Sequence, residues 1–245
     1  MTQQEHIIIV PPGQASGLHR LHFTPAHPCY RVEREGRLTG QNTGGLRGGF
    51  LALETTSWDG MRRIEPLCRE ILNECTAHGF FGVMLTNPSR SAAHLEIFLA
   101  EHRLRLLVPE RCAGLVKAAG VYLSSALSGG CLEDRLAQGL ERFGPERLTL
   151  LLEQSAEDFF LPAPTGCGRP LSGAELAALK DRWKPSIFFS SPLCARYFTY
   201  MSRESGAHFV LFDDRDTMTR KLERARAAGV RSFLLPSPQL ALLCH

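Results

Sequence analysis

The sequence predicts an α/β fold, a (β/α)8 barrel built as one domain over residues 1–245. Two observations favour this class. Short apolar runs recur along the chain without polar and apolar alternation, which is typical of strands buried on both faces of a parallel sheet. Amphipathic helical patterns separate these runs. A count of about eight strands favours a closed barrel over a doubly wound sheet, and no G-x-G-x-x-G motif follows the first strand.

The expected strands are short apolar runs at His6–Val10, Gly49–Thr55, Phe80–Thr86, Leu104–Val108, Val121–Ser125, Leu148–Glu153, Ser186–Ser190 together with His208–Phe212, and Arg231–Leu235. The expected helices lie at Met61–His78, Ser91–His102, Leu132–Phe143, Ser172–Trp183 and Asp216–Ala228. Asp213 and Asp214 are candidate N-caps of the last helix, and Gly229 is suited to end it.

Residues 11–48 fit this pattern least well. They are rich in Gly, Pro and His, and they contain one hairpin candidate at Tyr30–Thr39, around Glu35-Gly36. We therefore expect an irregular segment or a hairpin insertion here, and a first third of the barrel that is abbreviated or irregular. No linker and no internal repeat divides the chain.

Composition excludes several classes of partner. The formal charge is +3 and no block of Lys or Arg stands out, so we expect neither a nucleic-acid nor a membrane partner. The apolar run near the N-terminus is too short for a signal peptide, and no run approaches the roughly 20 apolar residues of a membrane span. We therefore expect a cytoplasmic protein.

The eight cysteines and nine histidines form no recognisable metal or redox motif. No cysteine pair has C-x-x-C spacing, and His19 and His22 have no acidic or thiol partner at ligand spacing. No Ser/His/Asp arrangement or phosphate-binding loop is recognisable either. We expect no metal, no cofactor and reduced cysteines.

The C-terminal half carries a recognisable series of segments: Ala195–Tyr200, His208–Asp214, Thr217–Leu222 and Gly229–Arg231. This series resembles the end of family-18 glycoside hydrolase barrels, and it is most similar to spore cortex-lytic N-acetylglucosaminidases and LysM-associated peptidoglycan hydrolases. Upstream, Asp158–Pro162 resembles the exit of the seventh strand of those enzymes, and Phe80–Leu85 falls where their fourth, catalytic strand lies.

The same resemblance implies that the catalytic motif is degenerate. Family-18 enzymes read D-x-x-D-x-D-x-E along the fourth strand, where the Glu is the general acid and the Asp two residues before it orients the substrate's N-acetyl group. The four matching positions hold residues without a carboxyl group, namely Phe81, Met84, Thr86 and Pro88. None of these can donate a proton to a glycosidic oxygen.

The sixth strand departs from the family in the same way. The family's M-x-Y-D there supplies a Tyr and an Asp that contact the N-acetyl group, and the matching positions are Ala126 and Leu127. In the family, a Trp at the end of the eighth strand forms the base of the sugar-binding subsite. The matching position in this sequence lies near Pro236. The resemblance therefore implies a barrel without ordinary glycosidase activity.

Other carboxylates lie at expected strand ends, where barrels keep their active sites. Glu54, Glu110 and Glu153 each follow or end an apolar run. Glu153 could face Glu54 or Glu110 across the barrel mouth as a relocated acid/base pair. Alternatively, all three cap loops, pair with arginines or face solvent.

Candidate ligand-binding residues are Ser128, Gly129 and Gly130, together with Asp158. The Ser128–Gly130 loop could bind a ligand through backbone N–H groups, or it could start the next helix with Ser128 or a neighbour as the cap. The aromatic residues in 188–200 could stack on sugar rings or pack against the barrel.

The expected function is a catalytically degenerate family-18-like protein with a binding or scaffold role. Its partner would be an N-acetylglucosamine-containing glycan or peptidoglycan fragment, or another protein. The alternative is an active hydrolase on peptidoglycan- or chitin-type substrates that uses Glu153 with Glu54 or Glu110.

Overall fold

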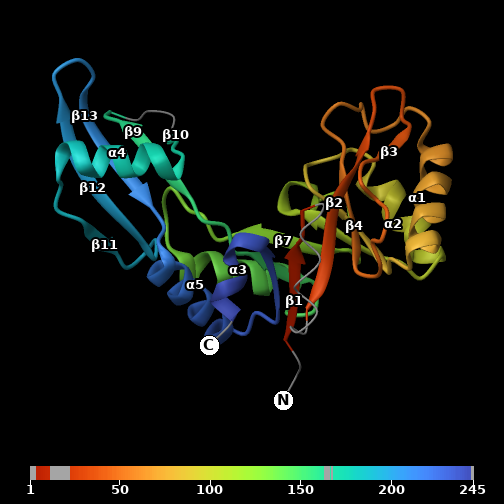
Figure 1. The fold of residues 1–245 in the computed structure, drawn as a ribbon. Coiled ribbons are helices and arrows are strands. Elements are labelled where there is room, and N and C mark those ends of the chain that lie inside the picture. Colours follow the sequence, from red (N-terminus) through yellow and green to blue (C-terminus); the bar gives the residue numbers. More distant parts are fainter. Residues whose placement is uncertain (1–3, 12–22, 163–165, 167, 244–245) are drawn as a thin grey trace. The chain divides into compact units, whose positions relative to one another are not determined.

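The computed structural model describes residues 4–11, 23–162, 166 and 168–243 (Figure 1). Contacts group the chain into two compact units. The first holds residues 1–123, 142–151 and 231–240, and the second holds residues 124–141, 152–230 and 241–245. The expectation of one domain over the whole chain stays a prediction. None of the described helices is long and apolar enough to span a membrane.

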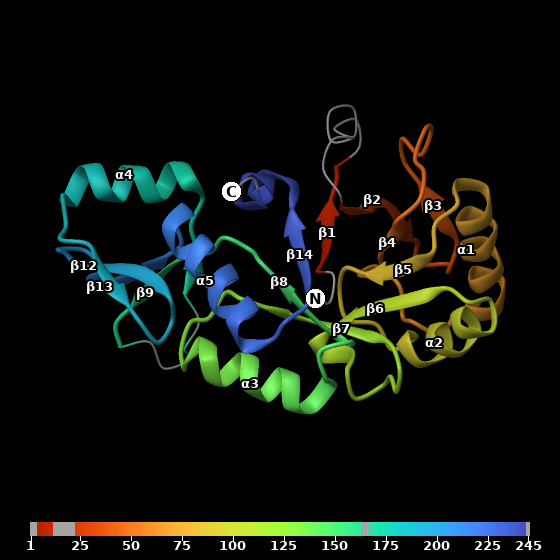
Figure 2. The same ribbon diagram turned by 90° about the horizontal axis from the view of Figure 1, so that it is seen from below.

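The first unit contains a closed barrel of eight parallel strands, which can be followed in Figure 2. In chain order they are β1 (Glu5–Ile9), β2 (Thr24–Val32), β4 (Phe50–Glu54), β5 (Gly82–Leu85), β6 (Arg105–Pro109), β7 (Gly120–Ser124), β8 (Leu148–Leu151) and β14 (Ser232–Pro236). The first strand pairs with β14 on one side and with β2 on the other, which closes the ring. The predicted barrel is confirmed.

One barrel strand was missed by the sequence prediction. Thr24–Val32 forms β2, but Pro25 and Pro28 interrupt its apolar run, so it does not read as a buried strand. Its register against β4 shifts between His27 and Tyr30, which marks a bulge in this strand. The predicted hairpin is present at its end, where β3 (Leu38–Gly40) pairs antiparallel with β2.

One predicted barrel strand lies elsewhere. The expected strand made of Ser186–Ser190 and His208–Phe212 belongs to the sheet of the second unit. The predicted number of eight barrel strands is therefore correct, but the prediction omitted β2 and counted a strand of the second unit in its place. With β2 included, β5 is the fourth barrel strand along the chain, β7 the sixth and β8 the seventh.

The helices agree closely with the prediction. They are α1 (Ile64–His78), α2 (Ala92–Glu101), α3 (Leu132–Phe143), α4 (Gly173–Trp183) and α5 (Arg215–Ala228). In the first unit, α1 connects β4 to β5 and α2 connects β5 to β6. A 3-10 turn, Glu110–Cys112, follows β6. No helix lies between β2 and β4, so this part of the barrel is irregular as expected.

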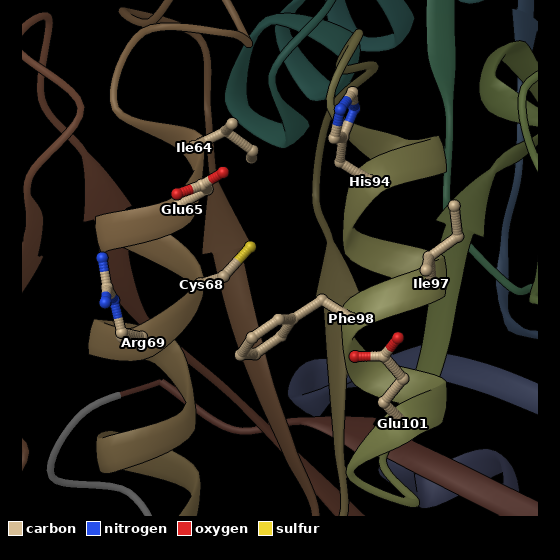
Figure 3. Close-up of a pocket in the computed structure, with 8 residues that line it drawn as sticks. All are labelled: Ile64, Glu65, Cys68, Arg69, His94, Ile97, Phe98 and Glu101. Carbon is tan, nitrogen blue, oxygen red and sulfur yellow. The ribbon is translucent and has the colours of Figure 1, made fainter.

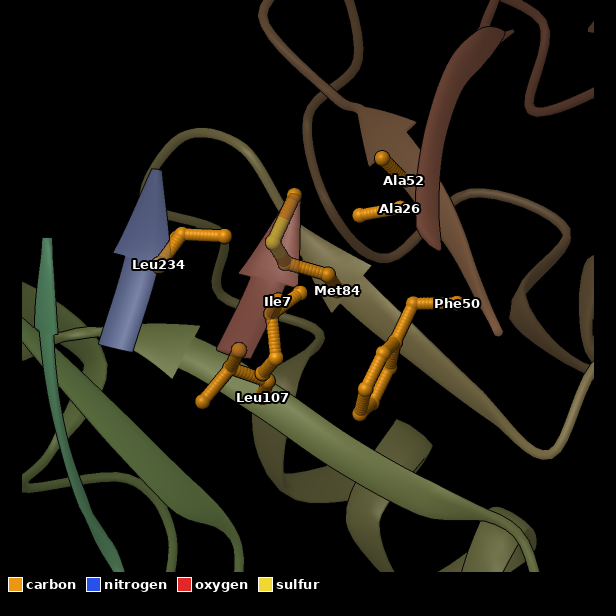
Figure 4. Close-up of a cluster of buried hydrophobic side chains, with 7 residues drawn as sticks. All are labelled: Ile7, Ala26, Phe50, Ala52, Met84, Leu107 and Leu234. Atoms are coloured by element: carbon orange, nitrogen blue, oxygen red, sulfur yellow. The ribbon is translucent and has the colours of Figure 1, made fainter. Parts of the chain in front are cut away.

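Apolar side chains fill the barrel interior (Figure 4). The buried cluster is Ile7, Ala26, Phe50, Ala52, Met84, Leu107 and Leu234, contributed by six of the strands. Gly82 leaves room for the Phe50 ring, because a Cβ atom at Gly82 would lie 2.7 Å from that ring. The interior is thus a packed core rather than a pore. Membership in this cluster also shows which side chains of each strand face inward.

The second unit is built on a five-stranded antiparallel sheet. Its strand order is β10 (Arg169–Pro170), β9 (Ala156–Phe160), β13 (Gly206–Phe212), β12 (Ala195–Ser202) and β11 (Phe188–Ser190). Helix α4 lies across one face (Figure 1), where Leu176 and Leu179 pack against Phe198 and Val210. This sheet is inserted in the chain after β8, and the chain returns through α5 to β14.

Candidate functional site at the barrel mouth

The carboxyl ends of the barrel strands form the candidate site in the first unit. Side chains two residues apart on a strand project to the same side. Ala52 and Met84 face the barrel core, so Glu54 and Thr86 continue the same two rows at the strand ends. A cavity of about 280 Å³ opens here, lined by Pro28, Cys29, Tyr30, Arg31, Gln41, Ala52, Glu54 and Thr86.

The polar groups of this cavity are of mixed type. Arg31 on β2 is the register partner of Glu54 on β4, and both side chains are exposed. The Arg31 guanidinium also lies 3.9 Å from Glu33. Together with Gln41 and Thr86, the site offers a cation, a carboxylate, an amide and a hydroxyl group. It can therefore both donate hydrogen bonds to a polar ligand and accept them.

Asn87 ties two strand ends together, which sequence reasoning did not foresee. Its Oδ1 accepts a hydrogen bond from the Thr55 backbone N–H at 2.8 Å, and its Nδ2 donates to Thr55 Oγ1 at 3.0 Å. The Thr86 hydroxyl donates to the Leu53 carbonyl at 3.2 Å. These bonds fix the ends of β4 and β5 relative to each other. A polar Thr-Asn pair directly after a buried strand is the sequence signal that could have found them.

The three candidate carboxylates have different environments. Glu54 is exposed at the end of β4, and Glu110 is half-buried at the start of the 3-10 turn after β6. In the second unit, the Glu153 carboxylate accepts a hydrogen bond from the Ser124 hydroxyl. Glu153 and the other two carboxylates belong to different units, and their pairing stays a prediction.

The loop after β7 lies in the second unit. Ala126 and Leu127 follow the end of the sixth strand, and the Ala126 N–H donates to Ser124 Oγ at 3.0 Å. The Ser128 hydroxyl donates to Glu157 at 2.9 Å and lies four residues before α3. Gly129 and Gly130 are exposed. A ligand-binding role of this loop stays a prediction.

Comparisons of sequence give no relative. No protein-family model and no curated protein matches the chain. Solved structures with the same fold are found. The spore cortex-lytic enzyme SleL of Bacillus cereus matches with a TM-score of 0.67 at 13% identity, over 99% of this chain and 74% of that one. A chitinase from Chromobacterium violaceum matches with a TM-score of 0.67 at 14% identity, over 94% and 93%.

The putative sporulation-specific glycosylase ydhD of Bacillus subtilis matches with a TM-score of 0.61 at 12% identity, over 83% of this chain and 87% of that one. The chain has a family-18-like barrel fold. At these identities the likeness shows the fold alone. It confirms the fold that the C-terminal segments led us to expect.

In this family-18-like barrel, the matching catalytic positions surround the fourth strand, β5. Phe81 precedes it, and its ring packs on Phe50 at 5.2 Å. Met84 is buried in the barrel core. Thr86 and Pro88 follow the strand and are exposed. All four positions thus lie in or next to the fourth barrel strand along the chain. None of the four side chains carries a group that ionises.

Asp158 lies in β9 of the second unit and is buried. Its carboxylate accepts a hydrogen bond from the Tyr200 hydroxyl at 2.9 Å and contacts His208 Nδ1 at 2.9 Å. His208 Nε2 lies 2.8 Å from the Ser205 hydroxyl. No Ser/His/Asp arrangement was recognisable in the sequence, but the structure brings these three side chains together. Ser205 and His208 belong to one hairpin, and the pairing of β9 with β13 brings Asp158 to them, which no short motif reveals.

The hydrogen-bond network of Ser205, His208 and Asp158 is poorly suited to nucleophilic catalysis. An acyl-transfer site needs free N–H groups for the developing oxyanion. The nearby N–H groups of Glu204 and Ser205 instead donate to Ser202 Oγ, at 3.3 and 3.4 Å. Ser205 is exposed in the hairpin turn between β12 and β13. The network therefore joins three strands, and both Asp158 oxygens are already occupied by protein partners.

Metal binding has no support in the described ranges. No group of three or more His, Cys, Asp or Glu side chains there could hold a metal ion.

Proposed function

We propose that this family-18-like barrel binds an N-acetylglucosamine-containing glycan at its mouth without cleaving it. The observation that carries the proposal is the inward row of β5. Its buried member is Met84, and the next residue in the row is Thr86, whose hydroxyl donates to a main-chain carbonyl. A glycosidase of this type needs a carboxylic acid in that row, because the leaving oxygen must be protonated.

A threonine hydroxyl cannot replace the missing acid. General acid catalysis is efficient when the pKa of the donor lies near the working pH, and it contributes typically 10²–10⁴-fold to the rate. Pro88, at the position of the family's general acid, has no proton to give. Chemistry that relies on the substrate's N-acetyl group also needs an orienting acid, and Thr86 occupies that position.

Binding remains chemically reasonable at the same place. The cavity of about 280 Å³ is close to the lower end of ligand-site volumes, about 300 Å³. Arg31, Gln41 and Glu54 can hydrogen-bond to the hydroxyl and amide groups of a sugar. The glycan class comes from the resemblance and from the fold neighbours, two of which are named as a cortex-lytic enzyme and a chitinase.

Calorimetric titration with N-acetylglucosamine oligomers and soluble muropeptides tests the proposal. Wild-type protein should bind one of these ligands, and its melting temperature should rise with ligand concentration. Glu54→Gln and Gln41→Ala should weaken binding, whereas Glu35→Gln, an exposed carboxylate in the hairpin turn, should not. No binding by the wild-type protein to either ligand class would refute the glycan proposal.

One alternative, a hydrolase with relocated carboxylates, depends on Glu153, which accepts a hydrogen bond from Ser124 at the end of the sixth strand. Release of new reducing ends from the same ligands measures it directly. Turnover that disappears in Glu153→Gln, and also in Glu54→Gln or Glu110→Gln, would replace the binding proposal with this alternative. Turnover that survives all three substitutions would show that none of these carboxylates is the catalyst.

A further inference from the structure

Helix α2 carries apolar side chains on the side that faces away from the barrel. A helix at a protein surface normally has one apolar stripe and a polar outer face. Helix α2 buries Ala92, Leu95 and Leu99 toward the sheet. On its other side, Ile97 is 64% exposed and Phe98 is half-buried. Ile97 thus leaves apolar surface on the outside of the helix that a contact with another protein would cover.

The exposed side of α2 forms one wall of a groove. The other wall is α1, and the space between them has a volume of about 370 Å³ (Figure 3). Apolar groups from both helices line its middle, namely Cys68, Ile97 and Phe98, and Ile64 lies at the end near His94 (Figure 3). Both helices belong to the first unit. This groove is larger than the mouth cavity and is built from residues that the candidate site does not use.

Ionisable groups lie along both walls of this groove (Figure 3). On α1, Glu65 lies toward one end and Arg69 toward the other. On α2, His94 lies toward the first end and Glu101 toward the second. Within the described part of the chain, none of these four side chains is held in an ion pair. Each helix thus offers a basic group at one end and an acid at the other.

This arrangement is self-complementary. A two-fold axis across the helices would turn one copy end over end relative to the other. Glu65 would then face Arg69 of the partner subunit, and His94 would face Glu101 of the partner subunit. The apolar middle of one groove would meet the apolar middle of the other. A symmetric dimer requires such a patch, since each surface must match itself.

We propose that the groove between α1 and α2 is the interface of a homodimer. A second copy fits better than a peptide of one charge sign, because the groove presents acidic as well as basic groups. The apolar contacts would supply most of the affinity, and the rim charges would set the antiparallel orientation and the association rate. The proposal is independent of whether the mouth binds a glycan.

Sedimentation velocity over a range of protein concentrations tests the dimer. Wild-type protein should shift from monomer to dimer as its concentration rises. Ile97→Glu should weaken association at least tenfold, because it places a charge in the apolar middle. The matched control is Met201→Glu, which changes a side chain that is 66% exposed in the second unit. That variant should associate like the wild type.

Charge reversal tests the orientation. Arg69→Glu should weaken the dimer by placing an acid opposite Glu65 of the partner subunit, and the double variant Glu65→Arg/Arg69→Glu should restore it. These residues lie at the exposed rim, and thermal melting should show that each variant remains folded. A wild-type protein that stays monomeric at millimolar concentration would overturn the proposal. Equal association of Ile97→Glu and Met201→Glu would overturn it as well, and failure of the double variant to recover would reject the antiparallel pairing.

Discussion

The ammonium group of Lys221 lies 2.8 Å from the carboxylate of Asp213, and both side chains are almost completely buried. Asp213 also accepts hydrogen bonds from Ser155 Oγ at 3.0 Å and from Thr217 Oγ1 at 3.1 Å. The sequence suggested Asp213 and Asp214 as caps of the same helix. Only Asp214 is the N-cap of α5, where it accepts from the Thr217 N–H. Asp213 instead is the buried counter-ion of Lys221.

Breaking this pair should strongly destabilise the protein. Asp213→Ala leaves a buried ammonium group without a counter-charge, and losses of this kind cost about 3–5 kcal/mol. Urea unfolding followed by circular dichroism measures the change. The double variant Asp213→Leu/Lys221→Met removes both charges and should recover a large part of the loss. A single variant as stable as the wild type would show that the pair contributes little.

Glu96 should make stability depend on pH in mild acid. Burial raises its pKa, but hydrogen bonds from the backbone N–H groups of Lys117, Ala118 and Ala119, together with the charge of Arg147, outweigh burial and lower the pKa below 4.5. A lowered folded pKa means that the carboxylate stabilises the fold above the unfolded value. This contribution is lost as the pH falls through the folded value.

The matched variant is Glu96→Gln. At pH 7 it should be less stable than the wild type, and the difference in free energy of unfolding should shrink below pH 4.5, where the wild-type carboxylate takes up its proton. Thermal melts between pH 3 and pH 7 provide the measurement. A constant difference across that range would contradict the assignment.

Gly82 should not tolerate a side chain. A Cβ atom there would lie 2.7 Å from the Arg105 carbonyl oxygen and 2.7 Å from the Phe50 ring, inside the barrel core. Gly82→Ala should therefore cost about 1–3 kcal/mol by overpacking. Gly129→Ala is the matched control, because no atom lies within 4 Å of the added carbon. Chemical denaturation should separate the two variants clearly, and equal stability would be inconsistent with the packing around Phe50.

The cysteines should differ in reactivity. Burial raises the pKa of the Cys68 thiol to about 11 and that of Cys75 to about 12, so few thiolates form there at neutral pH. Cys131 is partly exposed. Iodoacetamide should modify Cys131 in the native protein and spare the other two. Peptide mass spectrometry reads out the sites, and unfolding in guanidinium should equalise them. Native labelling of Cys75 as fast as Cys131 would disprove the prediction.

The sequence predicts the helices and most barrel strands because their apolar spacing reflects burial directly. Helix α1 is an example, with Leu67, Cys68 and Ile71 on its buried side. The same rule misses β2, whose prolines break the apolar run and whose pairing depends on a bulge. It also assigns His208–Phe212 to the barrel, since a buried antiparallel strand and a buried parallel strand have the same composition.

In the candidate site, positions within one strand could be predicted from the sequence, but contacts between residues far apart in the sequence could not. The fourth-strand positions could be located because alternation along β5 and the family pattern agree. The link between Asn87 and Thr55 could not, because it joins residues 32 positions apart. The contact of Asp158 with His208 also escaped prediction, since it exists only through pairing of strands far apart in sequence.

The pairing of β1 with both β2 and β14 has a consequence for how the chain folds. On the ribosome, the last barrel strand, β14, is synthesised only after residue 231. By then the seven earlier barrel strands and the inserted sheet have already been made. Until then β1 and β8 present unpaired edges, which can attract other chains. Closure of the ring joins residues more than 220 positions apart, so it is expected to be slow. A nascent or truncated chain without β14 should therefore depend on chaperones.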